Sequence, residues 1–362
     1  VTLAGGKLVL GYIRDAWSLV RIVDRDGGHA TDAGLKPYGS IDVGSSRWKE
    51  TEIYLSYVSF TTPVVISRME PSSGRLSEWA KETVPFDGSG VEVKQVWYKS
   101  KDGTRIPMFV AAKKGLILDG RTPTLLYGYG GFSVSIQPAF SATWAAWIEN
   151  GGVLAVANLR GGSEFGEAWH KAGMLENKQN VFDDYIAAAE WLIANKYTSP
   201  DSLAIQGGSN GGLLVGVAMT QRPELYRAVL CSVPLLDMLR YHKFLLGPLW
   251  TPEYGSADDP KQFAYIYKYS PYHHVKQGAK YPAVMFKTGD ADTRVAPLHA
   301  RKMAALMQSA TGSGLPVLLH YDTSVGHSAG LPVTKEIEDG TDVMAFLMSQ
   351  TGLSLTRPAP VK

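Results

Sequence analysis

The stretch AIQGGSNGGLLV, from Ala204 to Val215, decides the fold of this 362-residue chain. It begins as an apolar run typical of a strand and continues as an apolar helical pattern, with four glycines around one serine at the junction. Gly207–Gly211 matches G-x-S-x-G, the nucleophile elbow, in which a tight strand-to-helix turn lifts a serine hydroxyl to the helix N-terminus. Glycines flank Ser209 because side chains at those positions would collide with the strand or the helix.

The surroundings of this motif decide between two interpretations. G-x-S-x-G alone is a weak indicator, because glycine-rich structural turns that contain a serine are common. Here the motif ends a strand and opens a helix within an alternating pattern of strands and helices, which is the context it requires. A dinucleotide-binding fingerprint is disfavoured because Ser209 stands where the middle glycine of G-x-G-x-x-G would be. The sequence therefore predicts a serine nucleophile.

The alternating pattern covers residues 84–362 and predicts a doubly wound α/β domain with a mostly parallel sheet. The strands are expected in apolar runs, as is typical of strands buried on both faces: TLLYGY, VLAVANL, SLAIQG, RAVLCSV, AVMFKTG and PVLLHYD. Apolar residues spaced by three and four predict a helix over 182–196, with Asp183 and Asp184 in its first turn. The domain boundary is expected in KETVPFDGSG, residues 81–90.

Residues 1–83 are rich in short β-branched and aromatic runs separated by DGG, GSS and PSSG turns. This pattern indicates antiparallel strands, either as about two propeller blades of about 40 residues each or as a small sandwich. Two blades cannot close a ring. If the propeller interpretation holds, we expect the chain to be part of a longer protein.

A serine nucleophile needs a general base and an acid that orients it, in the chain order Ser, Asp or Glu, His for this fold class. Asp290 and Asp292 are the acid candidates, in the loop after AVMFKTG. His327 is the base candidate, in the glycine-flanked loop after PVLLHYD. The other histidines weighed as bases precede the acid candidates, lie inside a strand or fall on a predicted helix: His242, His273, His274, His299 and His320.

An oxyanion hole is also required for acyl transfer. The backbone N–H of Asn210, next after the nucleophile, is one expected donor. The second is expected from LLYGYGGF, residues 125–132, whose glycines allow close backbone approach and whose Tyr127 and Tyr129 carry hydroxyl donors.

Composition narrows the partners and the compartment. A net charge of +2 and the lack of an apolar run of about 18 residues favour neither nucleic acid nor a membrane as a partner. The single cysteine, Cys231, lies in apolar AVLCSVP and is interpreted as a buried structural thiol. We expect a cytoplasmic protein, although a disulfide-free periplasmic one also fits, and the true N-terminus is not expected in this sequence. No Cys/His cluster has zinc spacing, so no metal or organic cofactor is expected.

Several segments together closely resemble the prolyl oligopeptidase family of serine peptidases: YGYGGF, NLRGGSEFGEAWH, GGSNGG, KYSPYHHV, TGDADTRVAPLH and GHSAG. The resemblance runs through almost all of residues 84–355, and YVSFTTPVVISRM resembles the final propeller strands of the family. It implies an α/β-hydrolase domain preceded by the last blades of a β-propeller. It also implies that a further N-terminal half, absent here, is required for activity.

The same resemblance assigns the catalytic roles. Ser209 is implied as the nucleophile, Asp292 rather than Asp290 as the orienting acid, and His327 as the general base. The Tyr129 hydroxyl and the Asn210 N–H are implied as the oxyanion hole.

The substrate-binding positions are likewise implied by the resemblance. Arg294 would bind a substrate carbonyl, since its guanidinium is permanently charged with donors in a fixed fork. The specificity pocket falls on Phe132, Trp250, Tyr254 and Val295, and the indole in GPLWTPEYG would stack on a proline ring.

The predicted function is a serine endopeptidase that cleaves short proline-containing peptides after proline through an acyl-enzyme. The alternatives are another α/β-hydrolase activity of the same clan, such as an acylaminoacyl-peptidase, a dipeptidyl-peptidase or an esterase, or a non-catalytic interaction module. A complete Ser/Asp/His set argues against the last of these.

Overall fold

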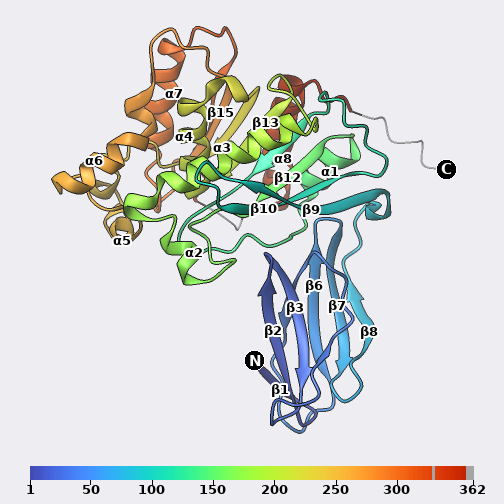
Figure 1. The fold of residues 1–362 in the computed structure, drawn as a ribbon. Coiled ribbons are helices and arrows are strands. Elements are labelled where there is room, and N and C mark those ends of the chain that lie inside the picture. Colours follow the sequence, from blue (N-terminus) through green and yellow to red (C-terminus); the bar gives the residue numbers. More distant parts are fainter. Residues whose placement is uncertain (328–330, 356–362) are drawn as a thin grey trace.

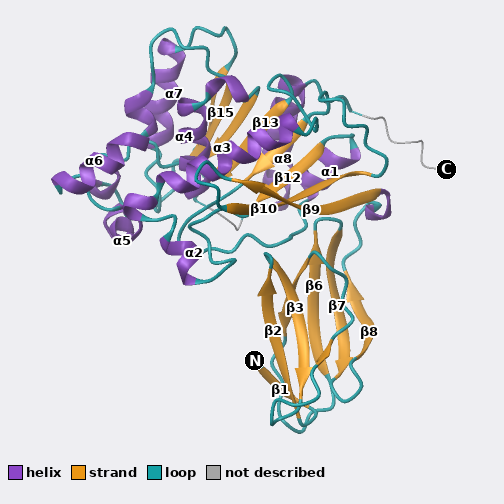
Figure 2. Cartoon of the chain, in the orientation of Figure 1, coloured by secondary structure: helices purple, strands orange, loops and turns teal. Residues whose placement is uncertain are grey.

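The computed structural model describes residues 1–327 and 331–355, which form two N-terminal four-stranded sheets and a larger α/β domain (Figures 1 and 2). The predicted catalytic domain, residues 84–362, extends past these limits. Its residues 356–362, like residues 328–330 of the GHSAG segment, lie outside the described residues. No helix of the described residues is long and apolar enough to cross a bilayer.

Both N-terminal sheets are antiparallel meanders of neighbouring strands. The first sheet contains β1 (Thr2–Ala4), β2 (Lys7–Arg14), β3 (Trp17–Val23) and β4 (Thr31–Asp32), and the second contains β5 (Gly39–Val43), β6 (Ile53–Ser59), β7 (Thr62–Glu70) and β8 (Arg75–Lys81). Alternate apolar side chains of both sheets form one small buried core, including Val9, Val20, Ile22, Leu55 and Met69. Each four-stranded sheet has the size expected of one propeller blade.

The α/β domain is built on an eight-stranded sheet of order β16-β15-β14-β13-β11-β12-β10-β9. Its strands are β9 (Val91–Lys99), β10 (Arg105–Lys113), β11 (Thr124–Tyr127), β12 (Val153–Ala157), β13 (Leu203–Gly208), β14 (Ala228–Ser232), β15 (Ala283–Gly289) and β16 (Val317–Asp322). From β12 to β16 all neighbours are parallel, whereas β9 and β10 add an antiparallel edge. The mostly parallel sheet predicted from the apolar runs is confirmed.

Helices cover both faces of this sheet, as parallel strands require. The helices are α1 (Ala142–Glu149), α2 (Glu167–Lys171), α3 (Gln179–Ala194), α4 (Asn210–Gln221), α5 (Thr251–Tyr254), α6 (Pro260–Tyr269), α7 (Leu298–Ala310) and α8 (Val333–Thr351). Buried side chains of α3, α4 and α7 share one core with the sheet, and those of α1 and α8 share the other. Cys231 on β14 is buried as expected, and burial raises the pKa of its thiol.

Helix α3 differs from the helix predicted over 182–196. It begins three residues earlier, at Gln179, and ends at Ala194, so Asp183 and Asp184 do not lie in its first turn. Asp184 is fully buried and accepts hydrogen bonds from the Arg160 guanidinium, with a shortest N···O distance of 2.6 Å. Its carboxylate therefore neutralises a buried cation, which a helical-periodicity argument cannot detect.

The N-terminal sheets contact the α/β domain at β9 and β10, where Phe60 packs on Phe109, and at the segment after β11. Ser18 Oγ donates to Gln137 Oε1 at 2.7 Å, and Ser40 Oγ donates to the Pro138 carbonyl at 2.5 Å. The neighbouring Ile136 N–H donates to the buried Glu164 carboxylate at 2.9 Å. Glu164 thus anchors the stretch of chain that receives the N-terminal sheets.

Glu164→Gln is expected to flatten the pH dependence of stability. Burial raises the pKa of Glu164 from 4.5 to about 7, against the opposing hydrogen bonds. The folded chain therefore keeps a proton that the unfolded chain releases near pH 4.5. This contribution to stability is complete below pH 4.5 and is lost as the pH rises through 7. The difference between the two pKa values corresponds to about 3 kcal/mol.

Urea denaturation at pH 4.5 and pH 8 measures this effect. Between pH 4.5 and pH 8, the free energy of unfolding should fall by about 3 kcal/mol more in the wild-type chain than in Glu164→Gln. Glu167 is an exposed carboxylate three residues away, so Glu167→Gln should show the same pH dependence of stability as the wild type. If the free energy of unfolding had the same pH dependence in the wild type and in Glu164→Gln, the raised pKa of Glu164 would be contradicted.

Candidate active site

The predicted elbow forms between β13 and α4. Ser209 adopts φ 59° and ψ −117°, a backbone conformation that side-chain-bearing residues rarely take. A Cβ on Gly207 would lie 2.0 Å from the Gly211 carbonyl oxygen, and one on Gly212 would lie 2.7 Å from Pro234. Glycine is therefore required at Gly207, the first position of the motif, and at Gly212, which follows the motif. The expected collision is absent at Gly208, where a Cβ would meet only an ordinary contact at 3.8 Å.

Ser209, His327 and Asp292 form a continuous hydrogen-bonded chain. Ser209 Oγ lies 3.1 Å from His327 Nε2, and His327 Nδ1 lies 2.7 Å from Asp292 Oδ2. The second carboxylate oxygen, Asp292 Oδ1, accepts the backbone N–H groups of Arg294 at 2.9 Å and Val295 at 2.8 Å. Asp292 is buried, so these contacts fix both of its oxygens in place.

The competing acid and base candidates have other partners. Asp290 is exposed and accepts a hydrogen bond from the Tyr321 hydroxyl. His320 lies within β16 and pairs with Asp342 at 3.1 Å, and the buried His299 ring accepts the Asp237 N–H at 3.1 Å. Of the candidates weighed from the sequence, the structure brings together Ser209, Asp292 and His327.

The loop after β11 lies beside the elbow. Asn210 Nδ2 donates to the Tyr129 carbonyl at 2.5 Å, which ties this loop to the first residue of α4. The Tyr129 hydroxyl faces Ser209: burial raises its pKa, while the Arg294 charge and a hydrogen bond with Ser209 act in the opposite direction. The net rise keeps this hydroxyl protonated and able to donate at neutral pH. The Tyr127 ring instead packs edge-on against Trp144 at 5.2 Å.

The predicted substrate-binding residues fall into two groups. Phe132 and Trp250 are partly exposed, and Arg294 is exposed. Tyr254 and Val295 are 0% and 2% exposed, and the Tyr254 hydroxyl donates to Asn210 Oδ1 at 2.7 Å. Direct contact of Tyr254 or Val295 with a substrate would require neighbouring groups to move, and it stays a prediction.

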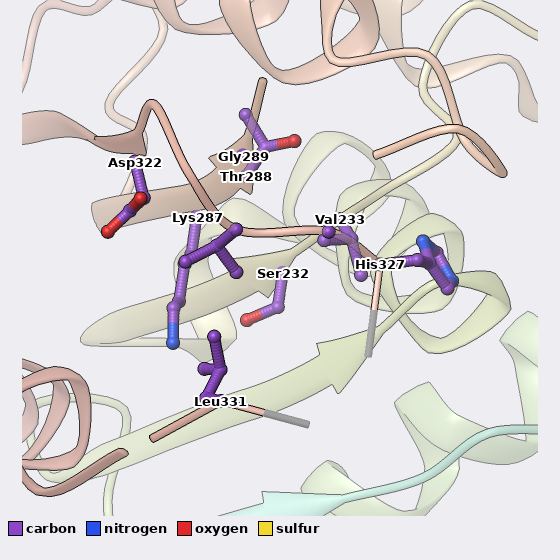
Figure 3. Close-up of a pocket in the computed structure, with 10 residues that line it drawn as sticks. Ser232, Val233, Lys287, Thr288, Gly289, Asp322, His327 and Leu331 are labelled. Carbon is purple, nitrogen blue, oxygen red and sulfur yellow. The ribbon is translucent and has the colours of Figure 1, made fainter. Parts of the chain in front are cut away.

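A cavity of about 180 Å³ lies behind His327 (Figure 3). Ser232, Lys287 and Asp322 line it from three neighbouring strands, β14, β15 and β16, and Leu331 lines it from the segment before α8. The His327 ring extends away from these side chains in Figure 3, and its Nε2 is hydrogen-bonded to Ser209 Oγ. The cavity therefore borders the loop that carries His327 and does not contain Ser209 among its lining residues.

Three charged or titratable side chains next to this site were missed by the sequence analysis. Lys178, Glu253 and His170 form a buried cluster beneath residues 129–132. Glu253 and His170 occur inside the quoted segments GPLWTPEYG and NLRGGSEFGEAWH, but nothing in their spacing indicates that they meet.

A strand-to-helix elbow with a serine, a histidine and a buried carboxylate in one hydrogen-bonded chain, at the carboxyl edge of a mostly parallel sheet, defines the α/β-hydrolase class. A family profile described as "Prolyl oligopeptidase family" matches residues 138–354. A second, described as "Prolyl oligopeptidase, N-terminal beta-propeller domain", matches residues 1–82. The chain belongs to the prolyl oligopeptidase family, and its N-terminal sheets are propeller blades rather than a sandwich.

Individual relatives agree with this assignment. The prolyl endopeptidase of Elizabethkingia miricola is 42% identical over 354 residues, which cover 98% of this chain and 50% of that protein. A solved prolyl endopeptidase, studied for the role of inter-domain dynamics in catalysis and specificity, matches with TM-score 0.93 and 48% identity over 98% of this chain and 52% of its own. Prolyl oligopeptidase B from Galerina marginata, solved with a 35mer hydrolysis and macrocyclization substrate, matches with TM-score 0.92 and 36% identity. The match covers 98% of this chain and 51% of that protein. The chain spans about half the length of these relatives.

Proposed function

We propose that this chain hydrolyses short peptides on the C-terminal side of proline through an acyl-enzyme. The observation that carries the proposal is the hydrogen-bonded chain from Ser209 Oγ through His327 to the buried Asp292. The names of the relatives, prolyl endopeptidase and prolyl oligopeptidase, support proline as the preferred residue before the scissile bond.

The roles follow from the donor and acceptor pattern. Ser209 attacks the substrate carbonyl while His327 Nε2 takes the Oγ proton, which it then returns to the leaving amine. Asp292 accepts from Nδ1–H and so keeps Nε2 free to act as a base. The tetrahedral oxyanion is stabilised by the Asn210 N–H and the Tyr129 hydroxyl. Water then repeats the sequence and releases the acid product.

Substrate selection rests on the aromatic groups beside the elbow. The Phe132 ring packs edge-on against Tyr254 at 5.4 Å, which holds it as one wall of the proposed pocket. The partly buried Trp250 offers a flat face to a pyrrolidine ring. The exposed Arg294, two residues from Asp292, provides a cation for a substrate carbonyl.

Two measurements on the full-length protein, in which this chain is joined to the N-terminal half that the family resemblance implies, test the proposal. A fluorophosphonate probe should label the protein, and peptide amides with proline before the scissile bond should be cleaved at least about 10-fold more efficiently than alanine analogues. Equal cleavage of both peptides would favour another activity of the same clan. A full-length protein that is neither labelled nor active would favour a non-catalytic role.

Trp250→Ala is expected to lower kcat/KM for proline peptides by about 10- to 100-fold and to leave alanine peptides nearly unaffected. The reason is that an indole stacked on the pyrrolidine ring stabilises a bound proline, whereas alanine has no ring for it to contact. Trp79→Ala removes an exposed tryptophan on β8 and should leave both peptides unchanged. An equal loss for both peptides would show that Trp250 does not contribute to selectivity.

A further inference from the structure

A buried cluster of Lys178, Glu253 and His170 joins three helices beneath the oxyanion loop, which we define as residues 129–132. Lys178 caps the start of α3, Glu253 lies on α5 and His170 lies on α2. Lys178 Nζ lies 3.1 Å from Glu253 Oε1, and His170 Nε2 lies 2.8 Å from Glu253 Oε2. Their side chains are 1%, 5% and 15% exposed, so the ion pair is almost completely removed from water.

The cluster bonds to the backbone of the oxyanion loop at two points. Lys178 Nζ donates to the Gly130 carbonyl at 2.9 Å, and the Phe132 N–H donates to Glu253 Oε1 at 3.1 Å. Asn210 Nδ2 holds the Tyr129 carbonyl at a third point. Phe132 has φ of 57°, a left-handed conformation that a residue with a side chain keeps only when its surroundings over-determine it, whereas Gly130 adopts φ 65° without strain. Three side chains thus hold the loop in a conformation it would otherwise leave.

Stability alone does not explain why this cluster is charged. Buried ion pairs can often be replaced by apolar side chains of similar volume without loss of stability. Burial lowers the pKa of Lys178 despite the nearby carboxylate. Burial also works against ionised Glu253, yet the Lys178 charge and the hydrogen bonds from His170 and Phe132 hold its pKa below the ordinary value. The cluster therefore supplies an ionised acceptor and a donor at fixed positions under the loop.

We propose that Lys178, Glu253 and His170 are positioning residues that hold the oxyanion loop, and through it the Tyr129 hydroxyl and the Phe132 wall, in the geometry required for turnover. This inference rests on the proposed function, because Tyr129 and Phe132 have roles only if an oxyanion forms at Ser209. The three residues act through the loop backbone, since the bonds that join them to the loop go to the Gly130 carbonyl and the Phe132 N–H. Outside the loop they contact one another, Glu167 and the Tyr254 ring.

A double-mutant cycle separates positioning from stability. Lys178→Met/Glu253→Met removes both charges together and so avoids an unpaired buried ion. We expect a fall in kcat of about 10- to 100-fold, because a displacement of about 1 Å costs up to about 100-fold. Tyr129→Phe should cost about 100-fold in the wild type but only about 1- to 10-fold in the Met/Met background, so that the combined variant is about as slow as Tyr129→Phe alone.

Two further variants serve as comparisons. Glu253→Gln retains an oxygen acceptor for the Phe132 N–H and should recover most of the activity and the full cost of Tyr129→Phe. Asp237→Asn/Lys302→Met removes another ion pair, of 2.5 Å, between a buried carboxylate and a partly buried lysine, away from the loop. This variant should stay within about 2-fold of wild-type turnover, and thermal unfolding should show whether each variant is folded.

The cycle is measured on proline and alanine peptides and on a p-nitrophenyl ester, since each forms an oxyanion. If the costs of the Met/Met pair and Tyr129→Phe multiply on every substrate, or if Glu253→Gln recovers nothing, the positioning role is overturned. If the costs fail to multiply but proline is not preferred, positioning stands and the proposed specificity fails. If the Met/Met variant does not fold, the cycle is run with Lys178→Met/Glu253→Gln, which removes the bond to the Gly130 carbonyl without leaving an unpaired buried charge. In this cycle, costs that fail to multiply support positioning and costs that multiply contradict it. A full-length wild-type protein inert towards every substrate would overturn both proposals.

Discussion

Ser209→Ala is expected to lower kcat for a proline peptide about 10⁶-fold and to abolish labelling by a fluorophosphonate. The hydroxyl is the group that bonds covalently to either reagent, and no other side chain at the elbow can replace it. Alanine retains the Cβ and tolerates the φ of 59° no better or worse than serine does. The variant should therefore keep the wild-type thermal midpoint, and the loss is assigned to chemistry rather than to folding.

Ser232→Ala is the matched control for this prediction. Ser232 ends the neighbouring strand, and its carbonyl accepts the Ser209 N–H at 2.9 Å, a contact that alanine preserves. Labelling and turnover should remain within about 2-fold of wild type. Labelling that survives in Ser209→Ala but disappears in Ser232→Ala would show that Ser232, not Ser209, is the nucleophile.

The parts of the site that could be predicted from the sequence are those with a local cause. The elbow is specified within six residues, because no side chain fits at Gly207 or at Gly212 on either side of Ser209. The parallel strands were predictable because strands buried on both faces have continuous apolar sequences. Since parallel strands end at one edge of the sheet, loops after β13, β15 and β16 bring their residues together there. Long-range contacts of the catalytic candidates therefore follow from topology.

The buried charges could not be predicted for the opposite reason. Lys178, Glu253 and His170 come from α2, α3 and α5, and their partners are set by how these short elements pack rather than by any repeat. Asp184 shows the same problem within one helix. The apolar periodicity predicts Asp184 in the first turn of a helix, whereas its carboxylate pairs with the buried Arg160 guanidinium. Ion pairs between distant elements have no signature in the sequence of either element.

Asp292→Asn is expected to lower kcat about 10⁴-fold while the fold is retained. The geometry gives the direction of the amide. Oδ1 accepts the N–H groups of Arg294 and Val295, so the amide oxygen must occupy that position. The amide NH₂ then faces His327 Nδ1 and donates to it. The imidazole is forced to carry its proton on Nε2, where it cannot accept the Ser209 proton.

Asp290→Asn provides the discriminating comparison, because the two aspartates lie two residues apart in the same loop. Asp290 is exposed and meets the Tyr321 hydroxyl rather than His327, so its variant should retain activity within about 2-fold. Steady-state turnover of a proline peptide measures both effects, and thermal unfolding confirms that both variants are folded. If Asp290→Asn lost activity and Asp292→Asn did not, the hydrogen bond between His327 and Asp292 would have no part in turnover. Comparable small losses in both variants would mean that the tautomer of His327 is held by some other group.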